Sequence, residues 1–391
     1  MIKIVDKAEC CGCQACANAC PLNCVSMKSD SEGFFYPSID ERYCINCGMC
    51  DRVCPFKKED SLRIRKPTTL AARIKDDDIR KNSSSGGVFS ILANKIIEDS
   101  GIVYGVGMSD DLKSARHFRV ASYEGLAKLR GSKYLQSNTG DIYRSVKHDL
   151  DNNTKALFSG TPCQVNGLML FLGREYKNLL TVEVVCHGVP SPALWVKYFD
   201  YLEQKYNAKI RSLNFREKRE GWKLFGLMEE GDNISRHLNH RKDPYMQMFL
   251  KNLCLRPSCY NCKPKKSESM ADITIADFWG VNSILPEMDD DLGTSLIMVQ
   301  TRKGEEELES LKELFESKIV DFSEGIKQNP AYFESCKRPS ERNTFFADMN
   351  KISFEKLQTK YCRKGNNSFL SRTILRIKTI GKRFFIRRKK Q

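Results

Sequence analysis

The sequence predicts an α/β protein, α+β overall, in which a small cysteine-rich unit precedes a larger body and a basic helix ends the chain. Three observations support this prediction. Ten of the 17 cysteines lie within the first 54 residues. From Thr68 onward, short apolar runs of strand length alternate with amphipathic stretches of helix length, which is typical of α/β domains. Residues 363–391 contain eleven Lys and Arg and no Asp or Glu.

The composition limits the class of protein. A chain of 391 residues is long enough for two or three domains. It has no apolar run near the ~20 residues of a membrane-spanning helix, and its start lacks the apolar core of a secretory signal, so we expect a cytoplasmic protein with reduced thiols. The net charge of +15 mostly reflects residues 363–391, because subtracting their +11 leaves about +4 for the rest.

Residues 1–58 contain two four-cysteine motifs, each with the spacing C-x2-C-x2-C-x3-C-P. This spacing places three thiolates around one cubane, and the proline directs the fourth cysteine to the other cluster. We therefore expect a bacterial-type 2[4Fe–4S] ferredoxin domain, with the first cluster on Cys10, Cys13, Cys16 and Cys54 and the second on Cys44, Cys47, Cys50 and Cys20. Zinc is the alternative, but zinc knuckles seldom carry two complete sets with both prolines. Cys11 and Cys24 exceed the ligand count and are interpreted as packed or partly exposed free thiols.

A charged linker at residues 59–67 leads into the body. There we expect helices at 88–99 and 305–317 and strands at 102–108, 156–159, 179–185, 272–276 and 295–301. Thr161 and Ser191, each followed by proline, have the pattern of helix N-caps. Cys163 and Cys186 each follow a predicted strand. They should lie at the carboxyl edge of the sheet, where ligands bind in open α/β folds.

Five segments of the body resemble one family, the coenzyme F420 hydrogenase/dehydrogenase beta subunits, which are related to 7-hydroxymethyl chlorophyll a reductase. They are SSSGGVF at 83–89, GSKYLQS at 131–137, GTPCQ at 160–164, CHGVPS at 186–191 and DITIADFWG at 272–280. The resemblance implies that 68–148 form the N-terminal part of this family's body. It also implies that 149–345 form the C-terminal part, with sites for a flavin and a third cluster.

The resemblance further implies an FAD held beside an iron–sulphur cluster. Residues Ser83, Ser84, Ser85, Gly86 and Gly87 precede a helix, whose amino-terminal N–H groups and dipole suit a pyrophosphate; an ordinary capped loop is the alternative. Further cofactor-binding candidates are Ser132, Lys133 for phosphate charge, Tyr134 for ring stacking, Gln136, Thr161, Asp277 and Trp279. A surface Lys-Tyr pair and a buried core Trp are the alternatives for those positions.

Cys254, Cys259 and Cys262 form a third group of metal-ligand spacing, flanked by basic residues. A fourth ligand is absent locally, and we favour Cys186 over Cys163 to complete a third [4Fe–4S] cluster. Cys163 would then lie near the flavin as a catalytic thiolate stabilised by its helix dipole. His187 is the candidate for proton delivery, although a His held by a backbone carbonyl is an equal alternative.

Residues 346–391 are expected to form a basic amphipathic tail. Its apolar positions recur at helical spacing among basic ones, which fits adsorption to the inner, anionic face of a membrane. The alternatives are a solvated or partner-docking tail and a nucleic-acid arm; the latter is disfavoured because no base-reading fold accompanies it.

These features predict an iron–sulphur flavoprotein oxidoreductase. It would pass electrons from a ferredoxin-like donor through the clusters to FAD and then to a small-molecule substrate. The alternative is a non-catalytic electron-transfer subunit of a hydrogenase or dehydrogenase complex, possibly linked to F420. Proteins of this combined architecture are similar to ones associated with bacterial surface-polysaccharide biosynthesis, and that resemblance alone suggests a role there.

Overall fold

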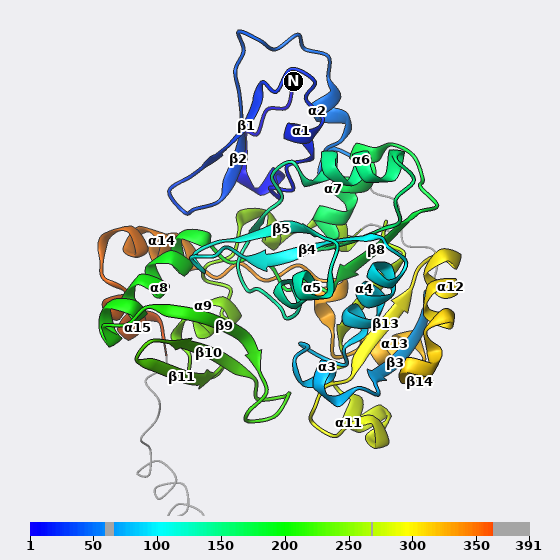
Figure 1. Ribbon diagram of the computed structural model, residues 1–391. Helices are drawn as coiled ribbons and strands as arrows, with labels where there is room; N and C mark the ends of the chain where they lie inside the picture. Colours follow the sequence, from blue (N-terminus) through cyan, green and yellow to red (C-terminus); the bar gives the residue numbers. More distant parts are fainter. Residues whose placement is uncertain (59–65, 267–268, 363–391) are drawn as a thin grey trace, which may run out of the picture.

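The computed structural model describes residues 1–58, 66–266 and 269–362. A small amino-terminal unit lies on one side of a larger body, as Figure 1 shows. In the small unit, the antiparallel strands β1 (Val25–Ser29) and β2 (Phe35–Ile39) accompany two single-turn helices, α1 (Ala15–Asn18) and α2 (Met49–Arg52). This is the small cysteine-rich unit that the sequence predicts.

One mixed sheet organises the body. Its nine strands, in spatial order β14-β3-β13-β12-β8-β7-β4-β5-β6, comprise β3 (Thr68–Ile74), β4 (Ile102–Met108), β5 (Ala115–Val120), β6 (Ser137–Asn138), β7 (Ala156–Gly160), β8 (Leu179–Val184), β12 (Ile273–Asp277), β13 (Ser295–Val299) and β14 (Phe315–Ile319). The four central strands, β12, β8, β7 and β4, are mutually parallel. Their carboxyl ends therefore meet at one edge of the sheet, where ligands bind in α/β folds.

Helices cover both faces of this sheet. They are α3 (Asp77–Lys81), α4 (Val88–Glu98), α5 (Tyr123–Leu129), α6 (Ile142–Asp151), α7 (Pro162–Leu172), α10 (Lys263–Lys266), α11 (Val281–Ile284), α12 (Arg302–Ser310) and α13 (Phe322–Ile326). Alternate strand residues face opposite sides. Phe158 packs with α6 and α7 on the side of the small unit. Leu157 packs with α4 and α12 on the other side.

A second, antiparallel sheet lies beside the main one and was not predicted from the sequence. It contains β9 (Ile210–Glu217), β10 (Gly226–Gly231) and β11 (Ile234–Asn239), which pack with α8 (Pro192–Tyr206), α9 (Pro244–Leu250), α14 (Arg342–Lys351) and α15 (Phe354–Tyr361). Aromatic rings fill this core, with Trp195 and Tyr245 fully buried. Phe354 and Leu357 are also buried there. The tail boundary expected at residue 346 is therefore wrong, and the rest of the expected tail, 363–391, lies outside the described residues.

The expected strands and helix starts agree with the structure with one exception. The helix from 88 and the strands at 102–108, 156–159, 179–185, 272–276 and 295–301 are present within a residue or two. Ser191 caps α8 by accepting from the Leu194 N–H at 3.0 Å, and Gln164 Oε1 accepts from Thr161 N at the start of α7. The helix expected over 305–317 is α12, which spans Arg302–Ser310; Lys312–Leu314 then form a 3-10 turn, and Phe315–Ile319 form β14, which pairs with β3.

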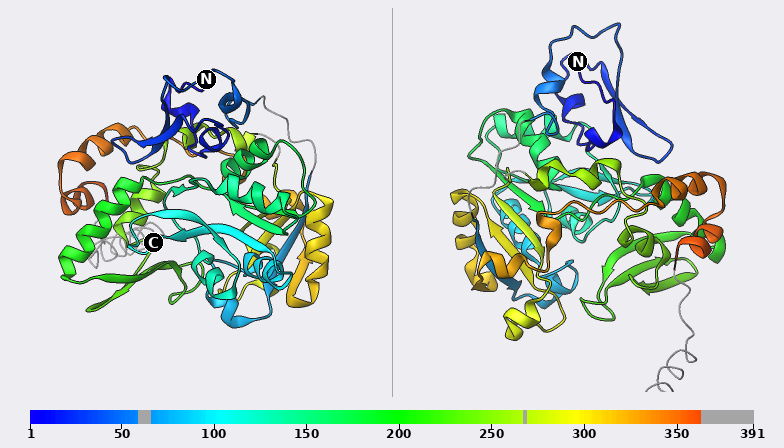
Figure 2. Two further views of the ribbon diagram at one scale, coloured as in Figure 1. Left: turned by 45° about the horizontal axis from the view of Figure 1, so that its top comes forward. Right: turned by 180° about the vertical axis from the view of Figure 1, so that it is seen from behind.

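The small unit contacts the body through polar side chains from several elements, and Figure 2 shows the two in further views. Thr139 donates to the Cys13 carbonyl at 2.9 Å, and Arg144 donates to the Asn18 and Cys20 carbonyls at 2.7 and 2.8 Å. Arg342 forms an ion pair with Glu32 in the β1–β2 hairpin at 2.6 Å. Because these contacts hold the cysteine loops themselves, the body fixes the position of the predicted cluster ligands.

Candidate functional site

The cysteines of the small unit form two groups that cross between the motifs. Burial, together with the thiols of Cys10, Cys54 and Cys50, raises the pKa of Cys16 to about 12. Cys54 also interacts with Cys10 of the first motif. Cys20 lines one hollow with Cys44, Cys47 and Cys50 of the second motif. This arrangement fits the crossed ligand pattern of paired [4Fe–4S] clusters.

The two surplus cysteines lie beside these groups. Cys24 is buried, and its Sγ is 3.3 Å from that of Cys20 in the same hollow. Cys11 is also buried and interacts with Cys13 and Cys163. Within the described ranges, no three His, Cys, Asp or Glu side chains converge as the ligands of a single metal ion do. Cys24 and the four thiols of the second group line one hollow, an arrangement that suits a cluster.

The two groups differ in their access to solvent. Cys47 is exposed, and the neighbouring Tyr43 and Ile45 are 63% and 68% exposed. Cys10, Cys13 and Cys16 of the first group are buried. The second group therefore has a solvent-facing side at Cys47, with Cys20 and Cys50 buried, whereas all four thiols of the first group are buried.

A cavity of about 650 Å³ lies at the carboxyl edge of the main sheet. All five segments that carry the family resemblance contribute to its lining, from the Ser83–Ser85 loop to Asp277 and Trp279. Its volume is in the usual range for cofactor and ligand pockets. The fold therefore brings together at one site motifs that are nearly 200 residues apart in the sequence.

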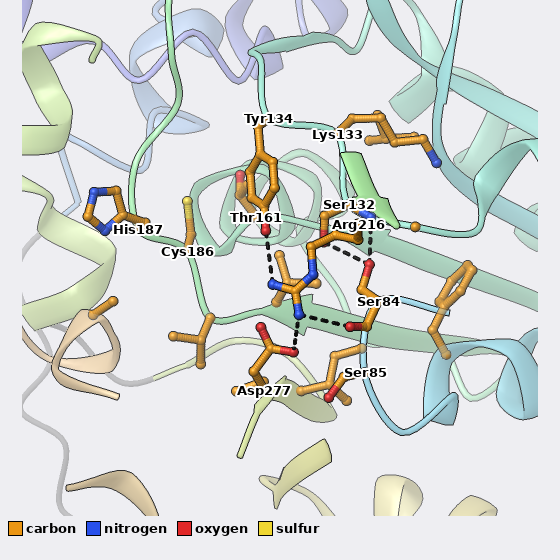
Figure 3. A pocket seen from close by; sticks show the side chains of 18 of the residues that line it. Ser84, Ser85, Ser132, Lys133, Tyr134, Thr161, Cys186, His187, Arg216 and Asp277 are labelled. Carbon is orange, nitrogen blue, oxygen red and sulfur yellow. Dashed lines mark hydrogen bonds and ion pairs between the residues drawn. The ribbon is translucent and has the colours of Figure 1, made fainter. Parts of the chain in front are cut away.

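Arg216 of β9 is the central cation of this cavity, as Figure 3 shows. Its Nη2 donates to Asp277 Oδ1 at 3.0 Å and to the Ser84 carbonyl at 2.9 Å, and its Nη1 donates to the Tyr134 hydroxyl at 3.2 Å. The guanidinium also lies 3.9 Å from the centre of the Phe225 ring. Arg216 was not predicted as a site residue, because a single arginine in a strand outside any motif gives no signal in the sequence.

Two loops meet beside Arg216. The Ser84 Oγ accepts from the Ser132 N–H at 2.7 Å, and the two hydroxyls are 3.0 Å apart. Trp279 lines the cavity and stacks on Trp222, with ring centres 4.7 Å apart and planes 8° apart. The predicted residues Ser83, Ser85, Gly87 and Thr161 also line the cavity.

Three predicted cofactor residues have other roles. Lys133 lines the cavity, but its Nζ donates to the carbonyls of Lys128 and Arg130 at the end of α5, at 3.0 and 2.7 Å, and points away from Arg216 in Figure 3. Gly86 does not line the cavity; a Cβ there would lie 2.3 Å from the Ala72 carbonyl, so packing requires this glycine. Gln136 is buried away from the cavity, donates to the Cys11 carbonyl and accepts from Arg256.

Two arginine nitrogens of the cavity lining have no acceptor. Arg216 Nε and Arg130 Nε are buried, and neither has a hydrogen-bond partner within the described part of the chain. Buried donors of this kind are costly unless an acceptor meets them. The cavity therefore suits a ligand with anionic or carbonyl oxygens.

A second, smaller hollow of about 30 Å³ adjoins the cavity and is surrounded by thiols. Its lining includes Cys11, Cys163, Cys186, Cys259 and Cys262. Cys186 and His187 line both spaces. Lys265 also lines the hollow; it is 4% exposed and donates to the carbonyls of His187 and Glu334. A buried cation among thiols suits an anionic cluster.

Cys254, one of the expected ligands of the third cluster, lies apart from the other three. Cys254 is fully buried in the aromatic core of the second sheet and does not line the hollow. Cys163 and Cys11 lie in the hollow with Cys186, Cys259 and Cys262, so Cys163 is available there as a fourth thiol whereas Cys254 is not. Cys336 lies nearby, but its Sγ donates to the His187 carbonyl at 2.8 Å.

The predicted catalytic roles are also altered. Cys163 does not line the large cavity where the flavin was expected, and the neighbouring Cys11 thiol together with burial raises its pKa. His187 Nε2 lies 2.6 Å from Asn252 Oδ1, and burial lowers its pKa below the usual range. His187 lies where the two spaces meet.

The fold and these thiol groups define an iron–sulphur protein of oxidoreductase type. Residues 9–58 match the 4Fe-4S dicluster domain. Residues 69–142 and 153–324 match the N-terminal and C-terminal parts of the coenzyme F420 hydrogenase/dehydrogenase beta subunit. The chain belongs to this beta-subunit family.

Two curated relatives carry coenzyme F420 in their names. The coenzyme F420-dependent sulfite reductase of Methanocaldococcus jannaschii is 23% identical over 330 residues, which is 83% of this chain and 49% of the relative. One subunit of the F(420)H(2) dehydrogenase of Methanosarcina mazei is 23% identical over 199 residues, which is 47% of this chain and 55% of the relative. The chain thus spans about half the length of these curated relatives.

A solved structure also resembles the chain. The F420-reducing [NiFe] hydrogenase complex of Methanosarcina barkeri contains a chain that aligns with a TM-score of 0.47 and 17% identity, covering 76% of this chain and 95% of that one. Among the described residues, no helix has both the length and the apolar content needed to cross a membrane.

Proposed function

We propose that this protein is an iron–sulphur electron-transfer subunit of an F420-linked hydrogenase- or dehydrogenase-like complex. The observation that carries the proposal is the continuity of the three thiol groups with the large cavity. Cys50 of the second group interacts with Cys16 of the first, and Cys13 of the first group interacts with Cys11 of the hollow. The hollow and the large cavity then share Cys186. The relatives named above are F420-linked enzymes or subunits.

In this proposal, a third [4Fe–4S] cluster is bound by Cys163, Cys186, Cys259 and Cys262, with Lys265 offsetting its charge. The large cavity holds FAD. The lining supports a flavin dinucleotide in two ways: Arg216 and Arg130 offer unpaired donors to phosphate or carbonyl oxygens, and Tyr134 and Trp279 offer ring faces. When bound, a flavin exchanges single electrons with clusters and electron pairs with a two-electron carrier.

Side chains around the large cavity are held in place by hydrogen bonds. Arg216 is fixed by Asp277, Ser84 and Tyr134. His187 holds its proton on Nε2 toward Asn252 Oδ1, and Asn252 Nδ2 in turn donates to the Lys337 carbonyl at 3.3 Å. That pair leaves Nδ1 as the ring nitrogen that can accept a proton. The solvent-facing second group is the point of exchange with a redox partner.

Anaerobic purification with iron and flavin quantitation tests the cofactors. About twelve irons and one FAD are expected for each chain, whereas about eight irons without flavin would remove both the third cluster and the FAD. Turnover then tests the role. F420 reduction by the chain only after a hydrogenase or dehydrogenase partner is added supports a subunit, and turnover with dithionite alone supports a self-contained flavin-dependent reductase. A role in surface-polysaccharide biosynthesis stays a prediction from resemblance.

A further inference from the structure

Arg256 lies fully buried where the ferredoxin domain meets the body. Its Nε donates to the Cys10 carbonyl at 2.7 Å, and its Nη2 is 3.5 Å from Cys10 Sγ. Its Nη2 also donates to the Phe35 carbonyl at 2.9 Å, and its Nη1 donates to Gln136 Oε1 at 3.0 Å. The guanidinium is therefore held in one orientation against a ligand of the first cluster.

The loop of the first motif is shaped around this arginine. Gly12 has a φ of +71°, and a Cβ there would lie 2.6 Å from Gln136 Nε2 and 2.9 Å from Arg256 Nη1. A side chain at this position would displace the pair. The glycine of the motif therefore permits the close approach of Arg256 to the cluster loop.

The charge of Arg256 has no carboxylate partner in the described part of the chain. Its hydrogen-bond acceptors are two carbonyls, an amide oxygen and a thiol, and it stacks over the Tyr36 ring at 4.2 Å. Arg342 provides a contrast, because it is also buried and also joins the ferredoxin domain to the body, but its charge is neutralised by Glu32. Arg256 thus applies an uncompensated positive charge at Cys10.

We propose that Arg256 raises the reduction potential of the first cluster and so favours an electron on the cluster next to the body. Reduction adds one electron and no proton, converting [4Fe–4S]2+ to [4Fe–4S]+, while the donating cluster loses one electron. The added negative charge is stabilised by a buried cation and by a hydrogen bond to a ligand sulphur. Arg256 is a positioning residue that acts through Cys10. The inference depends on the ferredoxin domain and not on a flavin.

Redox titration of the whole chain, followed by EPR under anaerobic conditions, tests this proposal. Arg256→Gln should lower the midpoint potential of the first cluster by at least about 59 mV, which corresponds to a tenfold change in the equilibrium constant for one electron. Arg342→Gln is the matched control, because it removes a buried domain contact without touching a thiol. It should leave both ferredoxin-domain midpoints unchanged.

Two results would overturn the proposal. Unchanged midpoint potentials in Arg256→Gln would show that the charge has no influence. An equal shift in Arg342→Gln would show that the cause is a change in how the ferredoxin domain packs against the body. Arg256→Lys covers the case in which Arg256→Gln loses iron, because it keeps the charge and loses the fork of donors. In that variant, a fall in the midpoint potential that corresponds to less than a threefold change in the equilibrium constant supports the proposal, and any larger fall refutes it.

Discussion

Replacing Cys163 and Cys254 separately distinguishes the ligand set of the structure from the one that the sequence predicts. Cys163→Ala should remove a ligand of the third cluster, so the iron content should fall by about four atoms from roughly twelve. Cys254→Ala should retain all iron. It removes one buried sulphur from an apolar core, where Cys254 is 0% exposed, and the lost packing should lower the free energy of unfolding by about 1 kcal/mol.

The assay is iron and acid-labile sulphide quantitation after anaerobic purification, together with EPR of the dithionite-reduced protein. Urea unfolding gives the stability of each variant. Cys259→Ala serves as a positive control, because Cys259 is a ligand in both arrangements. Loss of four irons in Cys254→Ala with full retention in Cys163→Ala would refute the structural assignment and restore the arrangement expected from sequence spacing.

Three other substitutions test the body of the protein. Arg216→Met leaves the Asp277 carboxylate without its buried cation, and urea unfolding should show a loss of about 3–5 kcal/mol; a loss below 1 kcal/mol would argue against the ion pair. Burial lowers the pKa of His117 to about 4, so its stabilising contribution is present above pH 6.5 and is lost as the pH falls toward 4. Between pH 7 and 5 the parent should therefore lose about 2 kcal/mol more than His117→Gln, and parallel stability curves would exclude this linkage. Gly86→Ala places a Cβ 2.3 Å from the Ala72 carbonyl oxygen, a clash with backbone that should cost about 1–3 kcal/mol; an unchanged urea midpoint would contradict it.

Features that depend on neighbours along the chain could be predicted from the sequence. The paired cysteine motifs specify cluster ligands, because the spacing of residues within one loop sets which thiolates reach one cubane. The strands from Ile102 and Leu179 and the proline-supported starts of α7 and α8 likewise follow from local periodicity and capping. The family segments also identified most of the cavity lining, from Ser84 to Asp277.

Which distant residues meet depends on tertiary packing. Cys163 and Cys186, which follow β7 and β8, lie beside Cys259 and Cys262 in the small hollow. Cys254, which precedes Cys259 in the chain, is instead packed in the apolar core of the second sheet. Arg216 reaches the cavity from β9, a strand of the separate sheet. These long-range contacts depend on how the sheets and helices pack. Contacts between residues 60 or more positions apart do not appear as a periodic pattern in the sequence.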